Sequence, residues 1–158
     1  MIRTEKWLRL CSTLLVANLI LIWGNSLLPG DVSGAISDAV KTILMPIVEL
    51  LFPGAGSSGG GGGLLRKVAH FTEFTCLGLC LTWLMSMLGK HKAMPLLFGF
   101  LTACVDETIQ AFVPGRNPNP VDVAIDTSGV ITGMILLLLG YHIYKHKNNN
   151  YILEENEP

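Results

Sequence analysis

Charged residues are scarce in this sequence, and their absence from two long stretches is its most informative feature. Asp, Glu, Lys and Arg together make up 15% of the chain, well below the roughly 25% of soluble domains. None of them occurs between Leu10 and Leu28 or between Thr127 and Tyr144. Each stretch approaches the ~20 residues that an α-helix needs to cross a bilayer. The composition therefore predicts an integral membrane protein.

An excess of positive charge is also missing. The formal net charge is −1, and the basic residues flank apolar segments instead of forming a patch, so nucleic acid is not an expected partner. The four cysteines form no CxxC pair and all lie in apolar segments, at Cys11, Cys76, Cys80 and Cys104. Buried, unreactive thiols are the expected state there.

The first apolar stretch has one feature of a secretory signal, because it follows Arg3, Lys6 and Arg9. It is longer than the apolar region of a usual signal peptide, and residues 23–29 after it contain no small-x-small cleavage site. We therefore interpret it as a retained membrane anchor.

We predict an all-α fold, that of a polytopic membrane protein with four transmembrane helices in a single domain over residues 1–147. The expected helices are about 7–28, 67–88, 93–112 and 122–144. The two middle helices reach spanning length only if they include polar residues, because their uncharged stretches, 74–89 and 93–105, are short. A charged group at bilayer depth costs at least ~2.5–3.5 kcal/mol on insertion scales. Because several charged residues fall at this depth despite that cost, we infer that they have a function.

The segment between the first two helices predicts an amphipathic outer-face helix. Its apolar residues recur at helical spacing, at Ile36, Val40, Ile43, Ile47 and Leu51. This helix would lie in the outer membrane interface or pack on the bundle as a surface helix, with a kink at Pro46. The glycine-rich stretch 54–63 is expected to be a flexible loop without chemistry. The polar tail 148–158 is expected to be disordered.

The distribution of basic residues predicts the orientation. Lys and Arg favour cytoplasmic loops, and most lie in segments on the side of the N-terminus: Arg3, Lys6, Arg9, Lys90, Lys92, Lys145 and Lys147. We therefore predict a multi-pass protein of the cell (cytoplasmic) membrane with both termini inside. This orientation brings the polar residues of three helices to the outer leaflet.

Those polar residues are expected to form one site. The predicted ligand-binding residues are Lys67, His70, Glu73, Asp106, Glu107, Gln110, Arg116, Asp122 and Asp126. Lys67, His70 and Glu73 share a helix face because they follow i, i+3 and i+6. Gly129 and Gly133, one turn apart, would let a neighbouring helix approach closely. So many carboxylates cannot all ionise in a poor solvent, so some must stay protonated or a bound cation must balance them.

These motifs resemble those of the VanZ-like family of membrane proteins. The resemblance rests on residues 67–74 (KVAHFTEF), 106–116 (DETIQAFVPGR) and 122–129 (DVAIDTSG), and on 25–30 (NSLLPG). The family is named for a teicoplanin-resistance protein. The resemblance therefore implies a cell-envelope protein that is linked in some members to reduced glycopeptide susceptibility. It implies no particular reaction.

Three functions suit such a site, and we rank them in order. The first is binding or transport of an envelope lipid or a lipid-linked cell-wall precursor, with Arg116 meeting an anionic group. The second is an enzyme on a lipid-linked substrate, with His70, Glu73 and Asp106 as catalytic candidates or as ligands of a divalent cation. The third is a structural protein whose charges hold the helices together. We assign no metal or other cofactor but leave a divalent cation open; a zinc hydrolase is not expected, because no second histidine joins His70 in the site.

Overall fold

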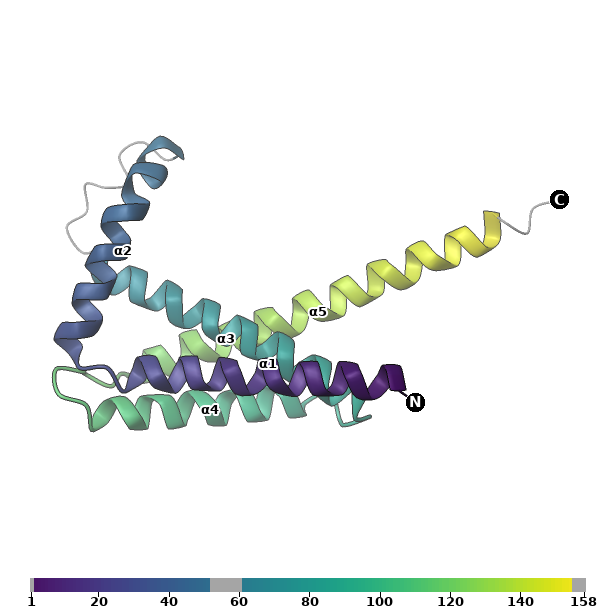
Figure 1. The fold of residues 1–158 in the computed structure, drawn as a ribbon, viewed down its shortest axis with the longest axis horizontal. Coiled ribbons are helices and arrows are strands. Elements are labelled where there is room, and N and C mark those ends of the chain that lie inside the picture. The colour runs from purple at the N-terminus through teal and green to yellow at the C-terminus, as the bar shows by residue number, and fades with distance from the viewer. Residues whose placement is uncertain (1, 52–60, 155–158) are drawn as a thin grey trace.

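The computed structural model of the chain describes residues 2–51 and 61–154, and within these ranges it contains helices and turns but no strand. The helices are α1 (Ile2–Ser26), α2 (Gly30–Leu51), α3 (Gly61–Met87), α4 (Met94–Ala111) and α5 (Pro120–Glu154). As Figure 1 shows, α1, α3, α4 and the first half of α5 pack into a bundle, from which α2 and the second half of α5 project. The predicted all-α class is confirmed.

Three helices in the described part of the chain are long and apolar enough to cross a membrane. The candidate spans are Thr4–Ser26, Leu65–Met87 and Pro120–Lys147, which correspond to the first, second and fourth predicted helices. α4 does not reach the same standard, because its last two turns carry Asp106, Glu107 and Gln110. The structure thus supports a membrane protein with three candidate spans, one fewer than predicted.

The two ends of the bundle are formed by different segments of the chain. The start of α1 and the end of α5 lie at one end together with the turn between α3 and α4, whereas α2 and the loop between α4 and α5 lie at the other (Figure 1). The polar motifs fall at the start of α3, the end of α4 and the start of α5. The fold therefore brings all three motifs to the α2 end.

The contact between α3 and α5 depends on glycine. A Cβ added to Gly133 would lie 2.1 Å from the carbonyl oxygen of Thr75, and one added to Gly129 would lie 2.6 Å from that of Phe71. Cβ atoms essentially never approach other atoms below 3.0 Å. The predicted close approach of a helix to Gly129 and Gly133 is therefore confirmed, and that helix is α3. A small apolar core lies beside this contact, formed by Ile22, Phe74, Leu77, Leu81, Ala103 and Val130.

Two helix ends differ from the expectation. α3 begins at Gly61, so it includes the last part of the glycine-rich stretch; residues 52–60 lie outside the described residues. α5 continues to Glu154, well beyond 144 and into the tail expected to be disordered. No glycine or proline occurs between Tyr141 and Glu157 to end that helix.

The exposure of some cysteine and α2 side chains adds to or differs from the expectation. Of the cysteines, Cys11 is buried but Cys76 is exposed, because it lies on the outer face of α3. On α2, the apolar residues Ile36, Val40 and Ile43 are exposed instead of packing on the bundle. α2 contacts α3 but projects from the bundle (Figure 1), so Ile36, Val40 and Ile43 keep 38–71% of their surface exposed.

Candidate functional site

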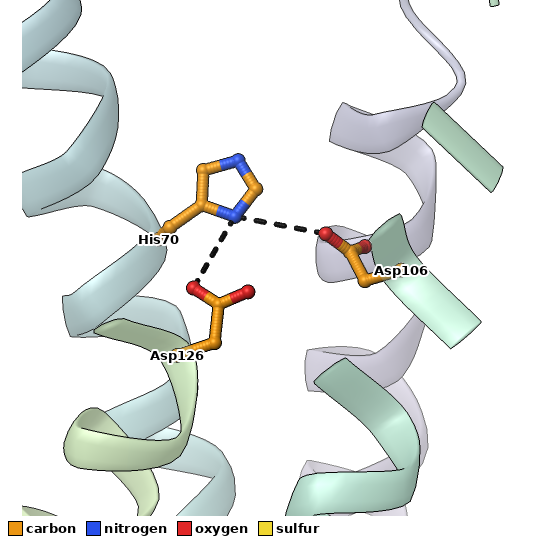
Figure 2. Close-up of side chains that lie close together, drawn as sticks. All are labelled: His70, Asp106 and Asp126. Atoms are coloured by element: carbon orange, nitrogen blue, oxygen red, sulfur yellow. Dashed lines mark ion pairs between the residues drawn. The ribbon is translucent and has the colours of Figure 1, made fainter. Parts of the chain in front are cut away.

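A buried cluster of three ionisable side chains lies between α3, α4 and α5. Figure 2 shows His70 facing both Asp106 and Asp126. Its Nδ1 lies 3.7 Å from Asp106 Oδ2 and 3.6 Å from Asp126 Oδ1. Both carboxylates are 0% exposed and His70 is 8% exposed. These separations exceed direct hydrogen-bond lengths, so the three groups share a small space without touching.

Asp106 is held in place by two donors. Ser26 Oγ, at the end of α1, donates to Oδ1 at 2.6 Å, and Gln110 Nε2, one turn further along α4, donates to Oδ2 at 2.9 Å. Ser26 and Gln110 are themselves fully buried. Neutral groups therefore fix the orientation of the Asp106 carboxylate and bring no positive charge to it.

Asp126 has no such support. Neither of its carboxylate oxygens has a hydrogen-bond partner, and neither does Nδ1 of His70. Buried polar atoms nearly always find a donor, an acceptor or an ion. The cluster thus sets two carboxylates against one imidazole and directs unsatisfied atoms into the same space.

Glu73 lies one turn further along α3 and fastens it to α1. Its Oε1 accepts a hydrogen bond from Asn25 Nδ2, and its backbone carbonyl accepts one from Asn18 Nδ2 at 3.3 Å. Its Oε2 has no partner. Glu73 therefore combines a structural contact with one oxygen that remains available.

Arg116 stabilises the end of α1. Its Nε donates to the Leu28 carbonyl at 3.0 Å and its Nη2 to the Asn25 carbonyl at 2.7 Å, at a helix end where carbonyls lack intrahelical partners. Burial, and next the charge of Arg66, lower the pKa of Arg116 below its usual range. Only Nη1 has no partner, so that nitrogen alone could serve the predicted contact with an anionic group.

The loop between α4 and α5 is anchored on both sides. Gly30 N–H, at the start of α2, donates to the Pro114 carbonyl at 3.0 Å. Gly115 has a φ of +74°, a conformation that favours glycine. On the α4 side, Glu107 Oε2 accepts a hydrogen bond from Asn119 N–H at 2.9 Å. Glu107 therefore positions the loop and lies outside the three-residue cluster.

The remaining predicted residues lie at the rim. Asp122 Oδ2 is 3.9 Å from Arg66 Nη2, and Asp122 Oδ1 is 3.9 Å from Lys67 Nζ. The Lys67 side chain is about half exposed, so this pair contributes at most ~1 kcal/mol to stability. The predicted set thus divides into a buried cluster supported by Gln110, an adjacent pair formed by Glu73 and Arg116, Glu107 at the loop, and a rim.

A small cavity opens beside the cluster, with a volume of about 100 Å³. Most of its lining residues are of polar types, and they come from α1, α2, α3 and the connecting segments. The lining residues are Asn25, Leu28, Ser33, Ile36, Ser37, Arg66, Ala69, His70, Glu73 and Arg116. A larger hollow of about 830 Å³ lies around Trp83 and Tyr141, but it is apolar and contains none of the predicted site residues.

Sequence reasoning missed two contributors to the site, Asn25 and Ser26. Asn25 and Ser26 are neutral and follow a long apolar helix, so neither charge nor spacing distinguishes them. Their only signal is the motif at 25–30, which indicates the family but not a place in the site.

Comparison with known proteins identifies the family. A family model described as VanZ/LLP1 matches residues 12–141, a region that contains the cluster, the cavity and all three motifs. No curated protein and no solved structure matches the chain. Because the match covers most of the sequence, this membrane protein belongs to the VanZ/LLP1 family.

Proposed function

We propose that the polar site binds, and in transport would move, the head group of an envelope lipid or of a lipid-linked cell-wall precursor. The observation that carries this proposal is the cavity of about 100 Å³, whose charged wall adjoins the exposed apolar stripe of α2. Lipids join a polar or charged head to apolar chains. A site that combines a charged cavity with an apolar helix face therefore suits such a ligand.

The proposal includes a fourth membrane crossing by α4. This helix exposes Phe98, Leu101 and Val105 on the outside of the bundle, and its polar residues face inward, where protein rather than lipid surrounds them. The excess of basic residues on the side of the termini favours an orientation with both termini in the cytoplasm. The site would then open towards the outer leaflet of the cytoplasmic membrane.

The wall of the cavity offers contacts for both signs of charge. Arg66 and the unpartnered Nη1 of Arg116 would donate to a phosphate or another anionic group. Glu73 Oε2 would accept from a hydroxyl or an amine. Ile36 belongs to both the cavity wall and the apolar stripe, so the acyl or prenyl chain would leave the cavity along α2.

A link to glycopeptide susceptibility follows as part of the same proposal. Glycopeptides act on lipid-linked precursors and on wall material outside the membrane. A protein that sequesters or moves such lipids would change how many drug-binding sites are exposed. Lower teicoplanin susceptibility in cells that produce this protein is the expected phenotype.

Binding of a defined lipid by the purified full-length chain tests the proposal. Native mass spectrometry from detergent micelles would compare undecaprenyl phosphate with phosphatidylcholine as probes. We expect the anionic polyprenyl lipid to bind more tightly, and Arg66→Gln to weaken it about tenfold through loss of a charge-assisted contact, about 1.4 kcal/mol. Lys92→Gln, which removes an exposed charge at the other end of the bundle, is the matched control. Equal binding of both lipids, or equal losses in both variants, would refute the proposal.

A second candidate is an enzyme that acts on the same head group. The observation that favours it is His70 held between two buried carboxylates, an arrangement suited to acid–base chemistry. Incubation of the protein with radiolabelled envelope lipids would reveal a product, and the product should disappear in His70→Gln. If no lipid is altered by the wild-type protein, the enzymatic candidate fails while the binding proposal stands.

A further inference from the structure

We infer that His70, Asp106 and Asp126 form a binding site for one divalent transition-metal ion of the Zn²⁺ or Mn²⁺ type. One ligand atom from each residue lies within 4.8 Å of the others, and all three residues are buried. They come from α3, α4 and α5, and their side chains converge on one space (Figure 2). A cation in that space would contact all three after small side-chain movements.

The unsatisfied atoms of the cluster point independently to an ion. Asp126 is 0% exposed, yet both of its oxygens lack a partner, as does His70 Nδ1. Of the basic side chains around the cluster, Arg66 and Lys67 approach Asp122, and Arg66 also donates to Gln110 Oε1 at 3.4 Å. A single dication would satisfy the imidazole nitrogen and balance both carboxylate charges. A proton on His70 would balance only one of them.

Beside the cluster, on the side of Asp122, there is room for one small particle. A hollow of about 10 Å³ borders His70 and Asp126, close to the volume that one water-sized particle needs. It is too small for an organic ligand. It opens towards the rim at Arg66, Lys67 and Asp122, so an ion has a path from the surface.

The surroundings of Asp106 are those of a metal ligand. Carboxylates that bind metals are usually oriented by further hydrogen bonds, and Ser26 and Gln110 supply two of them at 2.6 and 2.9 Å. Asp106 Oδ2 can accept from Gln110 and still bind an ion with its second lone pair. Asp126 has no such contacts, so its side chain would be the one that moves to bind the ion.

The donor set selects the class of metal. An imidazole nitrogen favours Zn²⁺, Mn²⁺ and related ions over Mg²⁺ and Ca²⁺, which prefer oxygen ligands alone. The cluster includes no thiolate, which argues against Cu⁺. Three protein ligands leave at least one coordination position for water or for a bound group. The inference needs no lipid, so it stands apart from the proposed function.

Metal content of the full-length protein tests the site. The chelator-treated protein in detergent would be loaded with Mn²⁺ or Zn²⁺, desalted and analysed by elemental mass spectrometry. We expect about one ion per chain, and at least a tenfold loss in His70→Gln and Asp126→Asn. Glu107→Gln, which removes the neighbouring buried carboxylate on α4, should keep the ion. Less than about 0.1 ion per chain in the wild type, or equal losses in all three variants, would overturn the inference.

A spectroscopic measurement on the wild type avoids the risk that a variant fails to fold. Pulsed electron paramagnetic resonance of bound Mn²⁺ detects the nitrogen of a coordinating histidine. A nitrogen signal in the Mn²⁺ spectrum that persists in a tenfold excess of Mg²⁺ supports coordination by His70. Bound Mn²⁺ without nitrogen modulation refutes the three-residue site. Neither result depends on lipid binding, so the two proposals can fail separately.

Discussion

Replacing Gly133 by alanine should destabilise the protein by forcing α3 and α5 apart. The added Cβ would lie 2.1 Å from the Thr75 carbonyl oxygen and 2.7 Å from the Leu79 backbone nitrogen. Both are backbone atoms, so no side-chain rotation relieves the contact. The helices must separate locally by about an ångström, and overpacking of this kind costs about 1–3 kcal/mol or more.

Thermal unfolding in detergent, followed by loss of the monodisperse chromatographic peak, measures this cost. At about 2–4 °C per kcal/mol for a chain of this size, the midpoint of Gly133→Ala should fall by roughly 5 °C. Gly140→Ala on the same helix is the matched control, because nothing lies within 4 Å of its added Cβ; its midpoint should be unchanged or slightly higher. If the two variants unfold at the same temperature, the glycine contact is not what joins α3 to α5.

Four further outcomes follow from the contacts of the site. Ser26→Ala should lower stability by about 1.5–3 kcal/mol, since it removes a donor to a buried carboxylate; a midpoint equal to that of the wild type would contradict this. Arg116→Ala should destabilise by a similar ~1–3 kcal/mol by removing the hydrogen bonds to the Asn25 and Leu28 carbonyls, and Arg116→Lys should recover only part of the loss; full recovery would show that geometry does not matter there. In a cysteine-free chain, Lys92→Cys should react with impermeant maleimide only from the cytoplasmic side and Asn119→Cys only from outside, and the reverse pattern would overturn the orientation. Asp126→Asn should raise or keep the unfolding midpoint of chelator-treated protein yet abolish its increase with added Zn²⁺; a Zn²⁺ response that persists would exclude Asp126 as a ligand.

Spacing and charge were sufficient to predict the helices that carry the site. The i, i+3 relation of His70 and Glu73 follows from helix geometry alone, and the scarcity of charge elsewhere makes each polar position stand out. The three motifs do come together at one end of the bundle. The closest of these contacts, among His70, Asp106 and Asp126, depends on how α3, α4 and α5 pack, which no single helix encodes.

Other features were beyond sequence reasoning for identifiable physical reasons. The polar residues that mark α4 as part of the site also lower its hydropathy, so the same residues that predicted a site leave α4 outside the candidate spans. Arg116 was expected to face a ligand, but most of its donors bind α1 carbonyls, a use that depends on where the α4–α5 loop folds back. The exposure of the α2 stripe likewise depends on the direction in which that helix leaves the loop.

The close contact between α3 and α5 accounts for the position of Asp126 in the buried cluster. Glycine packing brings the α5 backbone so close to α3 that Asp126 must face His70, although the carboxylate finds no hydrogen bond there. If these charges served only to hold helices together, a donor near Asp126 would make the contact stronger, as Ser26 and Gln110 do for Asp106. An unsatisfied buried carboxylate lowers stability, and proteins tend to retain such a cost where function needs it. The lack of support at Asp126, more than the number of charges, therefore favours the proposed binding site over an internal ion-pair network.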